Sequence, residues 1–412
     1  MAESSELISF ELARQCVLDH CKPLPVQSLP LADAAGLHLA HDIAAPFDLP
    51  PFTSSAMDGF GVRVSDVESA SPAAPVTLRI TETIFAGQRP TTPLSPGWAV
   101  KIMTGALVPP GVEAVVMREF TSEEAGSVLI RRPTTKGESI RPAGEEFRAG
   151  QVILRAGQRA TPAALGLLAT IGHSLVDVRM PPTVAVLVTG DELAPSGQAL
   201  AVGQRYDSNS VSLLTACRAE AISDVCVEHV PDDRDALVSA FRRWQDRCDV
   251  LLTVGGVSAG DRDYVPRALQ ECGATIHFHR AAIKPGKPIL FATLQRDRDR
   301  VLSFGLPGNP VSALLTFHLF VKPALRRMMG AERVLPLTLG AALATSLHKE
   351  VGRLEFVRAV LHNENGENTV HPLAGRESHM LGALASANCL IHFQAEAERL
   401  PAGSCVTVEL LD

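Results

Sequence analysis

The most regular hydrophobic pattern in the chain lies between residues 183 and 271. A continuous apolar run at 183–188 and two further strand-like runs at 225–230 and 249–254 have the length of buried strands. Segments in which apolar residues recur at helical spacing follow them, at 208–218, 234–245 and 265–271. Strands that alternate with helices at this spacing predict a mostly parallel sheet with helices on both faces.

Short β-like runs separated by proline and glycine dominate the chain on both sides of this α/β region. Before it they cluster between residues 43 and 135, where "VTLRI" and "SVLIRR" alternate apolar and polar positions. After a helical stretch that ends near Gly330, runs such as "CLIHF" and "SCVTVELL" return. The pattern predicts a β-rich domain, an α/β domain and a small C-terminal barrel or sandwich, and 412 residues are enough for several cores.

Composition narrows the classes of function. The formal net charge of -7, without a visible basic face, argues against broad nucleic-acid binding. The eight cysteines show no CxxC pair and no zinc spacing, so we expect reduced core residues. No run of about 18 uncharged apolar residues occurs, and the first ten residues lack the pattern of a secretory signal. We therefore expect a cytoplasmic protein that does not bind membranes.

Three loops should carry the chemistry, because ligands of open α/β sheets bind outside the carboxyl ends of the strands. In "GGVSAGDRDY", Gly255 and Gly256 allow close backbone approach, and Ser258 suits an anionic oxygen. Asp261 and Asp263 would repel a bare phosphate, so a divalent cation between carboxylate and phosphate is expected there. The alternative is a glycine-rich turn before a capped helix. In "TGDEL", Asp191 and Glu192 either cap a helix or provide carboxylates for a metal or a proton.

Basic and proline-rich loops complete the set. Arg280, Lys284 and Lys287 flank a Pro-Gly turn and either bind an anion or are simply solvated. In "GLPGNP" the prolines stiffen a connector whose Asn309 can cap the next helix. The thirteen histidines form no recognisable triad or metal pair, and a lone histidine such as His277 is expected to be a core or edge residue.

Taken together, the ordered motifs resemble one known family. They are "SSAMDGFGVR", "KIMTGALVPPGVEAVVMRE", "TGDEL", "YDSN", "GGVSAGDRDY", "AIKPGKP" and "GLPGNPVSA", spread from about residue 47 to 328. The set resembles the molybdopterin molybdenumtransferase family, which includes MoeA and the gephyrin E domain. "RLEFVRAVL" and "GRESHMLGALASANCL" extend the resemblance almost to the C-terminus.

The resemblance implies a multidomain α/β plus β fold in an elongated homodimer. Its central α/β domain is of the molybdopterin-binding type, and the C-terminal domain is a small β-barrel that faces the other subunit, giving a composite active site. On this chain we expect a helical/β linker domain at 1–44 and 136–178, a β-rich inserted domain at 45–135, the α/β domain at 179–330 and the barrel-like domain at 331–412.

The resemblance also implies a reaction. Molybdate is inserted into the dithiolene of adenylated molybdopterin with release of AMP, assisted by Mg²⁺, and a molybdopterin adenylyltransferase is the expected partner. The implied catalytic residues are Asp58, Thr104, Glu192, Asp232, Asp263 and Lys284, with Glu192 and Asp263 as Mg²⁺ ligands. Substrate binding is expected from Arg141, Gly255, Gly256, Ser258, Arg280, Lys287, Pro307, Pro310, Arg353 and Ser378.

Two departures from the family pattern concern single residues. The family often has Gly-Glu-Asp where this chain has Gly144, Glu145 and Glu146, and it often has Lys where Arg280 stands. Two other functions remain open at this point. One is a tungstate-selective paralogue, because molybdate and tungstate are similar tetrahedral oxyanions. The other is a gephyrin-like scaffold without turnover, which the retained acidic and basic loop residues disfavour.

Overall fold

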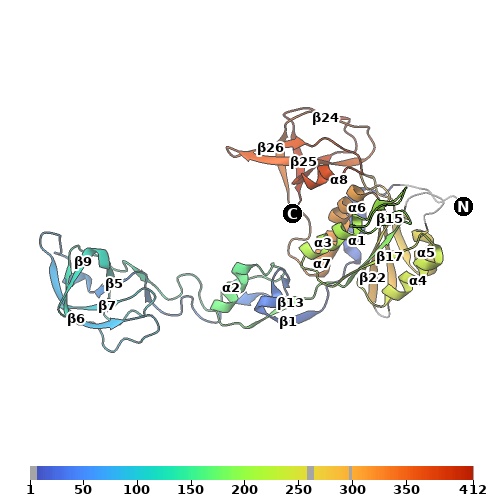
Figure 1. Ribbon diagram of the computed structural model, residues 1–412. Helices are drawn as coiled ribbons and strands as arrows, with labels where there is room; N and C mark the ends of the chain where they lie inside the picture. Colours follow the sequence, from blue (N-terminus) through green and yellow to red (C-terminus); the bar gives the residue numbers. More distant parts are fainter. Residues whose placement is uncertain (1–6, 258–263, 297–298, 412) are drawn as a thin grey trace. The chain divides into compact units, whose positions relative to one another are not determined.

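A computed structural model describes residues 7–257, 264–296 and 299–411, which form two compact units. The larger unit comprises Met1–His41, Ala156–Gly166 and Ser174–Asp412. The smaller unit comprises Asp42–Arg155 and Leu167–His173. Figure 1 follows the chain through both units by colour. Each unit has its own hydrophobic core, so each is described by itself.

A six-stranded sheet forms the centre of the larger unit (Figure 1). Its order is β17 (Val225–Val230), β14 (Val184–Thr189), β18 (Val250–Val254), β22 (Asp299–Leu306), β21 (Leu290–Arg296) and β19 (Thr275–His279). β17, β14, β18 and β22 run parallel, and β21 is antiparallel to both of its neighbours. The predicted mostly parallel sheet is therefore confirmed, with an antiparallel hairpin at one side.

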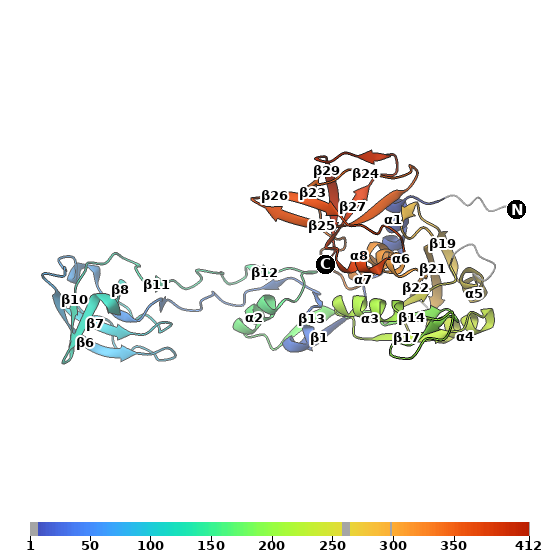
Figure 2. The same ribbon diagram turned by 45° about the horizontal axis from the view of Figure 1, so that its top comes forward.

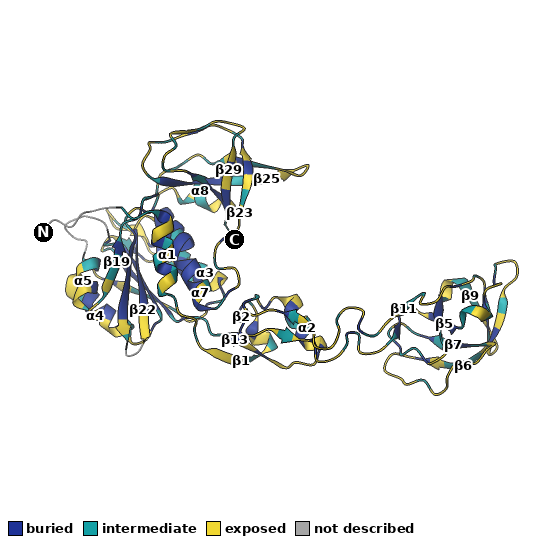
Figure 3. Cartoon of the chain, turned by 180° about the vertical axis from the view of Figure 1, so that it is seen from behind, coloured by how far each residue is buried: buried dark blue, intermediate teal, exposed yellow. Residues whose placement is uncertain are grey.

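The inner strands are buried on both faces because helices cover them, whereas the edge strands β17 and β19 are only partly buried. β14 and β18 are entirely buried, and the dark blue strands of Figure 3 show this core. The helices of this domain are α3 (Asn209–Ala219), α4 (Arg234–Gln245) and α5 (Val265–Glu271). α4 begins where Asp233 accepts a hydrogen bond from the Ala236 amide at 2.9 Å. These helices agree with the predicted segments to within one residue at each end.

The helical stretch after the sheet is interrupted. In place of one helix, the chain forms α6 (Pro310–Thr316), a π-helical turn labelled η4 (Phe317–Val321) and α7 (Lys322–Met328). Pro323 in the first turn of α7 has no amide hydrogen, so the regular ladder of hydrogen bonds cannot pass through it. The first helix of the chain, α1 (Phe10–His20), packs Phe10, Ala13 and Val17 into the same core.

Five strands near the C-terminus close into a small barrel (Figure 2). They are β23 (Thr338–Leu343), β25 (Leu354–Glu364), β26 (Glu367–Pro372), β27 (Cys389–Phe393) and β29 (Cys405–Leu410). The barrel closes because β25 pairs with both β26 and β27. One further strand, β20 (Ile283–Lys284) from the α/β domain, pairs with the start of β25 and joins the two domains.

A separate three-stranded sheet completes the larger unit. It pairs β1 (Val26–Pro30) and β2 (His38–Leu39) with the central β13 (Leu175–Arg179). The helix α2 (Pro162–Thr170) precedes β13 in the chain. Within the described residues, no helix combines the length and the apolar character that a membrane span requires.

The smaller unit is built on a second six-stranded sheet. Its order is β8 (Ala114–Met117), β5 (Gly59–Val62), β7 (Trp98–Ile102), β6 (Val76–Ile84), β10 (Ser127–Ile130) and β9 (Thr121–Glu124). Two short ladders join β4 (Ser54–Ser55) to β11 (Ile140–Arg141) and β3 (Ile43–Ala44) to β12 (Val152–Leu154). A Cβ on Gly59 would lie 2.1 Å from the Val116 carbonyl oxygen, so β5 and β8 can approach only through glycine.

A buried carboxylate ties the barrel to the helices of the α/β domain. Glu409 on β29 is 1% exposed, and its Oε1 lies 2.9 Å from Nε2 of His318 in η4. Its Oε2 lies 3.2 Å from Nε2 of His392 on β27. Burial opposes ionisation of Glu409, but the two histidines outweigh it and lower its pKa from 4.5 to about 2. The ionised carboxylate therefore stabilises the contact between the two domains.

Replacing Glu409 with glutamine should lower the free energy of unfolding by roughly 2 kcal/mol near pH 6. Because the folded-state pKa lies below the ordinary value, the stabilisation by the carboxylate is complete above about pH 4.5 and is lost as the pH falls toward 2. Urea unfolding at about pH 6 and about pH 3 should show a smaller difference between wild type and Glu409→Gln at the lower pH. Glu367→Gln, at an exposed position of β26, is the control. An equal difference at both pH values would contradict this account.

Candidate active site

A polar pocket lies at the carboxyl ends of the parallel strands β14, β18 and β22. Its volume is about 550 Å³. The loops that follow the three strands supply most of its lining, which includes Thr189, Gly190, Glu192, Asp232, Gly255, Gly256, Pro307, Gly308 and Pro310. We call this space the glycine-loop pocket. Its position is the one that the parallel sheet predicts for a ligand.

Glycine is required where two of these loops come together. Gly255 has φ +92°, and a Cβ on it would lie 2.8 Å from Oγ1 of Thr189. A Cβ on Gly308 would lie 3.7 Å from the Cα of Gly255. The backbone is therefore exposed to the pocket with no side chain above it. The Gly255 amide already donates to the Leu306 carbonyl oxygen at 3.1 Å, so an anion in the pocket would be met by other backbone amides of these loops.

Asn209 holds one side of the glycine-loop pocket and offers a free acceptor. Its Nδ2 donates to the Gly308 carbonyl oxygen at 2.8 Å, which fixes the side chain of this first residue of α3. Its Oδ1 is buried and has no hydrogen-bond partner among the described residues. A buried acceptor without a partner costs free energy, so a ligand that donates a hydrogen bond to it would be favoured.

The barrel reaches the same pocket through one loop. Asn309 donates from Nδ2 to Oγ of Ser378 at 2.8 Å, and the amide of Val311 donates to the Ser378 carbonyl oxygen at 3.2 Å. His379, the next residue, lines the pocket. The expectation that Asn309 caps the following helix was wrong for its side chain. Asn309 occupies the N-cap position of α6, but its amide is turned to Ser378 and makes no cap hydrogen bond.

A second, cationic pocket lies where β20 meets the barrel strand β25. Its volume is about 520 Å³, and its lining includes Lys284, Lys287, Lys349, Arg353 and Glu355. We call it the cationic pocket. Consecutive residues connect the two pockets: Lys287 lines the cationic pocket, and Pro288 lines the glycine-loop pocket.

One buried carboxylate organises the cationic pocket. Glu355 is 2% exposed and is paired in strand register with Lys284. Its Oε1 accepts hydrogen bonds from Nε and one Nη of Arg376 at 3.0 and 2.5 Å, and its Oε2 lies 3.6 Å from Nζ of Lys284. Lys349 adds a further positive charge. Burial is the largest of the effects that lower the pKa of Lys349, and the attraction of Glu355 opposes it only in part. The single buried negative charge therefore serves to place several cations around one space.

Arg280 differs from the other basic residues of this loop. It has φ +96°, a strained backbone conformation for a residue other than glycine. Its amide donates to the Ile289 carbonyl oxygen at 2.8 Å, and its own carbonyl oxygen accepts from Ile8 at 3.4 Å. Arg280 does not occur in the lining of either pocket as the described residues form them.

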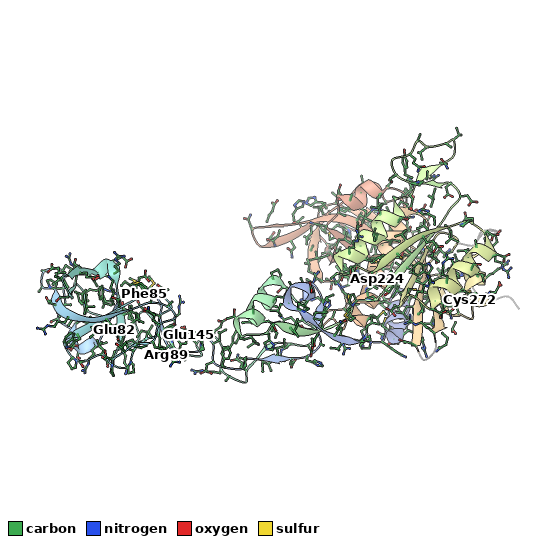
Figure 4. All side chains as sticks on the ribbon, turned by 60° about the horizontal axis from the view of Figure 1, so that its bottom comes forward. Glu82, Phe85, Arg89, Glu145, Asp224 and Cys272 are labelled. Carbon is green, nitrogen blue, oxygen red and sulfur yellow. The ribbon has the colours of Figure 1, made fainter. Side chains whose placement is uncertain are left out.

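In the smaller unit the structure brings two predicted residues together. Oδ1 of Asp58 accepts hydrogen bonds from the Thr104 amide at 2.7 Å and from the Thr104 hydroxyl at 2.8 Å. These two hydrogen bonds, the amide foremost, lower the pKa of the exposed Asp58. Arg141 is an exposed residue of β11 in the same unit. Glu145, in the segment that departs from the family pattern, also lies in this unit (Figure 4).

Comparison with known proteins identifies one family over nearly the whole chain. Three family models match in order: "MoeA N-terminal region (domain I and II)" at residues 8–172, "Probable molybdopterin binding domain" at 185–327 and "MoeA C-terminal region (domain IV)" at 340–411. Molybdopterin molybdenumtransferase of Haemophilus influenzae is 36% identical over 415 residues, which cover 98% of each chain. The chain belongs to the molybdopterin molybdenumtransferase (MoeA) family.

Further relatives support the same family. Molybdopterin molybdenumtransferase 2 of Mycobacterium tuberculosis is 38% identical over 396 residues, which cover 94% of this chain and 95% of the relative. The crystal structure of the molybdopterin biosynthesis moeA protein from Pyrococcus horikoshii matches with a TM-score of 0.81 at 28% identity, covering 98% of this chain and all of that one. The predicted family and the four-domain MoeA fold with a C-terminal barrel are confirmed. The individual domain boundaries stay a prediction.

The predicted site residues of this MoeA-family chain fall into separate groups. The glycine-loop pocket collects Glu192, Asp232, Gly255, Gly256, Pro307 and Pro310, with Ser378 attached through Asn309. The cationic pocket collects Lys284, Lys287 and Arg353. Asp58, Thr104 and Arg141 belong to the smaller unit. Ser258 and Asp263 lie outside the described residues. The catalytic and binding roles of all these residues stay predictions.

Sequence reasoning missed four residues that the MoeA fold brings to these pockets. They are Asn209, Lys349, Glu355 and Arg376. Glu355 and Arg376 stand inside "RLEFVRAVL" and "GRESHMLGALASANCL", so the motifs contained a signal. Neither motif shows that the two side chains meet, because pairing across strands is decided by the barrel.

Replacing Thr104 with valine should raise the pKa of Asp58 part of the way back toward its ordinary value. The change removes the hydroxyl donor and leaves the amide donor in place. Carboxyl resonances followed by NMR as a function of pH would measure it. Thr104→Ser keeps the hydroxyl and is the matched control. An unchanged titration of Asp58 in the valine variant would show that the hydroxyl has no influence.

Replacing Arg376 with methionine should destabilise the protein by about 3 kcal/mol, because it leaves the buried Glu355 with Lys284 as its remaining ion-pair partner among the described residues. A second variant that adds Glu355→Leu should recover part of this loss, since the uncompensated buried charge is then gone. Urea unfolding measures both variants. Arg399→Met, at an exposed position, controls for loss of a surface arginine. A double variant less stable than Arg376→Met would refute the explanation.

Proposed function

We propose that this protein is a molybdopterin molybdenumtransferase that inserts molybdate into adenylated molybdopterin and releases AMP. The observation that carries the proposal is the pair of adjoining pockets, one lined by glycine backbone, two carboxylates and one arginine, and the other lined mainly by cations. A substrate with a phosphoanhydride and a separate oxyanion substrate need these two environments side by side. The names of the full-length relatives support the same reaction class.

The glycine-loop pocket is suited to the pterin phosphates and the adenylate. Gly255 and Gly256 line this pocket and carry no side chain of their own, so anionic oxygens can approach their backbone closely. The free Oδ1 of Asn209 can accept a hydrogen bond from a pterin or adenine amine. Ser258 belongs to the same proposal from the sequence.

The cationic pocket is suited to molybdate. Lys284, Lys287, Lys349 and Arg353 surround a space that holds one buried carboxylate, Glu355. Lys349 is partly desolvated, which is why its pKa is lowered. Binding a doubly charged oxyanion would restore the balance of charge and favour the protonated lysine. The electrostatic attraction is stronger here than it would be in open solvent.

The acidic side chains of the glycine-loop pocket fit a bound Mg²⁺. Glu192 and Asp232 both line it and offer the carboxylate oxygens that Mg²⁺ prefers. Glu192 and Asp232 would thus hold the ion, and Asp263 belongs to the same proposal from the sequence alone. When bound, Mg²⁺ neutralises charge on the phosphoanhydride.

The protein's own groups position the reactants. Water attacks the phosphoanhydride, the P–O bond to the adenylate breaks and AMP departs, while the two dithiolene thiols displace oxygen from molybdate, which leaves as water with their protons. Lys284 stabilises the oxyanion next to that dithiolene, and Glu355 keeps Lys284 in place. No covalent nucleophile is needed, because positioning and electrostatics supply most of the acceleration of phosphoryl transfer.

Asp58, Thr104, Arg141, Arg280 and Ser378 complete the proposed set of functional residues. A homodimer with a composite site, a molybdopterin adenylyltransferase as the partner that delivers the substrate, and a cytoplasmic location belong to the same proposal. Within one chain the barrel already supplies Arg353 to the cationic pocket and His379 to the glycine-loop pocket. A second subunit would add residues to this arrangement.

Glu192→Gln, Asp263→Asn and Lys284→Met should each reduce molybdate-dependent AMP release by roughly a hundredfold, as expected when one group that stabilises developing charge is removed. The assay uses adenylated molybdopterin under anaerobic conditions, with and without molybdate and Mg²⁺. Asp235→Asn, an exposed acidic change on α4, is the control and should leave the rate unchanged. Tungstate in place of molybdate tests selectivity. Binding of the pterin without AMP release under either oxyanion would refute the enzyme and favour a scaffold.

A further inference from the structure

One cysteine and two histidines meet on the larger unit, away from the residues that line the two pockets. Cys16 and His20 stand one turn apart on α1, and His277 lies on the edge strand β19. Among the described residues, the Sγ of Cys16 and one ring nitrogen of each histidine all lie within 4.8 Å of one another. No sequence spacing could reveal this group, because His277 is distant from α1 along the chain.

Both histidines are already oriented by hydrogen bonds through one ring nitrogen. Nδ1 of His20 lies 2.8 Å from the Cys16 carbonyl oxygen, and Nε2 of His277 lies 2.9 Å from Oγ1 of Thr293. Each ring therefore keeps a second nitrogen for which the described residues supply no hydrogen bond. Histidines that bind metals characteristically use one nitrogen for the metal and donate the other to a carbonyl or similar acceptor.

The two rings are also held in place by packing. Their centroids are 3.9 Å apart, and both rings contact Phe291 on the neighbouring strand β21, at 5.7 and 5.3 Å between centroids. The register between β19 and β21 shifts between Ile276 and Phe278, so His277 is the extra residue of a β-bulge. Bulges commonly redirect a side chain beside a functional site. The bulge is a second observation, independent of the distances, that singles out His277.

We propose that Cys16, His20 and His277 bind a zinc-class divalent cation, with a fourth position open to water. A thiolate and two imidazoles form a set that Zn²⁺ prefers, and bond lengths near 2.0–2.3 Å place tetrahedral ligands about 3.5 Å apart. Small side-chain rotations bring the three ligand atoms to this separation from within 4.8 Å.

Access and charge balance are both satisfied. His20 lines an open pocket of about 700 Å³, which gives the ion and its water a path from solvent. Zn²⁺ replaces the proton of the Cys16 thiol, and that proton passes to the buffer. The bound ion carries a net single positive charge with its thiolate and joins α1 to β19, so it would stabilise the packing of the first helix on the sheet.

The test is titration of the metal-free, reduced full-length protein with Co²⁺, whose absorption reports both tetrahedral geometry and thiolate ligation. One Co²⁺ per chain should bind, with a sulfur-to-cobalt charge-transfer band, and Zn²⁺ should displace it. Cys16→Ser should abolish that band, and His20→Ala or His277→Ala should each weaken binding at least roughly tenfold. Thr293→Val, which removes the hydroxyl bonded to His277, should weaken binding by about tenfold with the band retained.

Other cysteines provide the controls. Cys226 and Cys405 are exposed, and Cys272 is half-buried near the end of α5, where Figure 4 marks it. Serine at these three positions should leave the charge-transfer band unchanged. Circular dichroism confirms that each variant is folded. A wild-type protein that binds no Co²⁺, or a band that survives Cys16→Ser, would overturn the site. Because the readout is metal binding, it is independent of AMP release and of the proposed transferase function.

Discussion

The pairing of β20 with β25 is the contact on which the site of the larger unit depends. It places Lys284, from the α/β domain, in register with Glu355, from the barrel. Glu355 is almost fully buried, so its charge has to be compensated, and Lys284 and Arg376 provide the compensation. The fold is in this way required to hold two cations beside one another. A negatively charged ligand next to them would be bound by charges that the protein has already placed.

Several of the contacts between the α/β domain and the barrel are polar. Asn309 donates to Ser378 beside the glycine-loop pocket, and Glu409 on the barrel contacts His318 of η4 and His392 of β27. Buried polar contacts of this kind fix geometry more strictly than apolar packing does, since a displaced partner leaves an unsatisfied group. The loops at the strand ends are therefore held by the barrel as well as by the sheet.

The two pockets differ in the charged groups that line them. Glu192, Asp232 and glycine backbone line the glycine-loop pocket together with Arg205, whereas the cationic pocket has three lysines and one arginine against Glu350 and Glu355. A protein with net charge -7 cannot attract anions by its overall field, so local cations have to do so. The proposed zinc-class site uses a different principle, because neutral ligands and one thiolate are brought together by a helix and a bulged strand. It would stabilise the packing of α1 on the sheet, separately from the chemistry of the two pockets.

The sequence by itself determined the α/β alternation, the barrel at the C-terminus, the family, and the loops around Glu192, Gly255 and Lys284. These are local properties, because hydrophobic periodicity and the residues that end a strand are written in consecutive positions. Only the tertiary structure decided that Glu355 meets Arg376, that Asn309 turns to Ser378 instead of capping its helix, and that His277 joins Cys16 and His20. Each of these contacts joins residues from different elements, so its existence depends on strand register and packing, which no local pattern specifies.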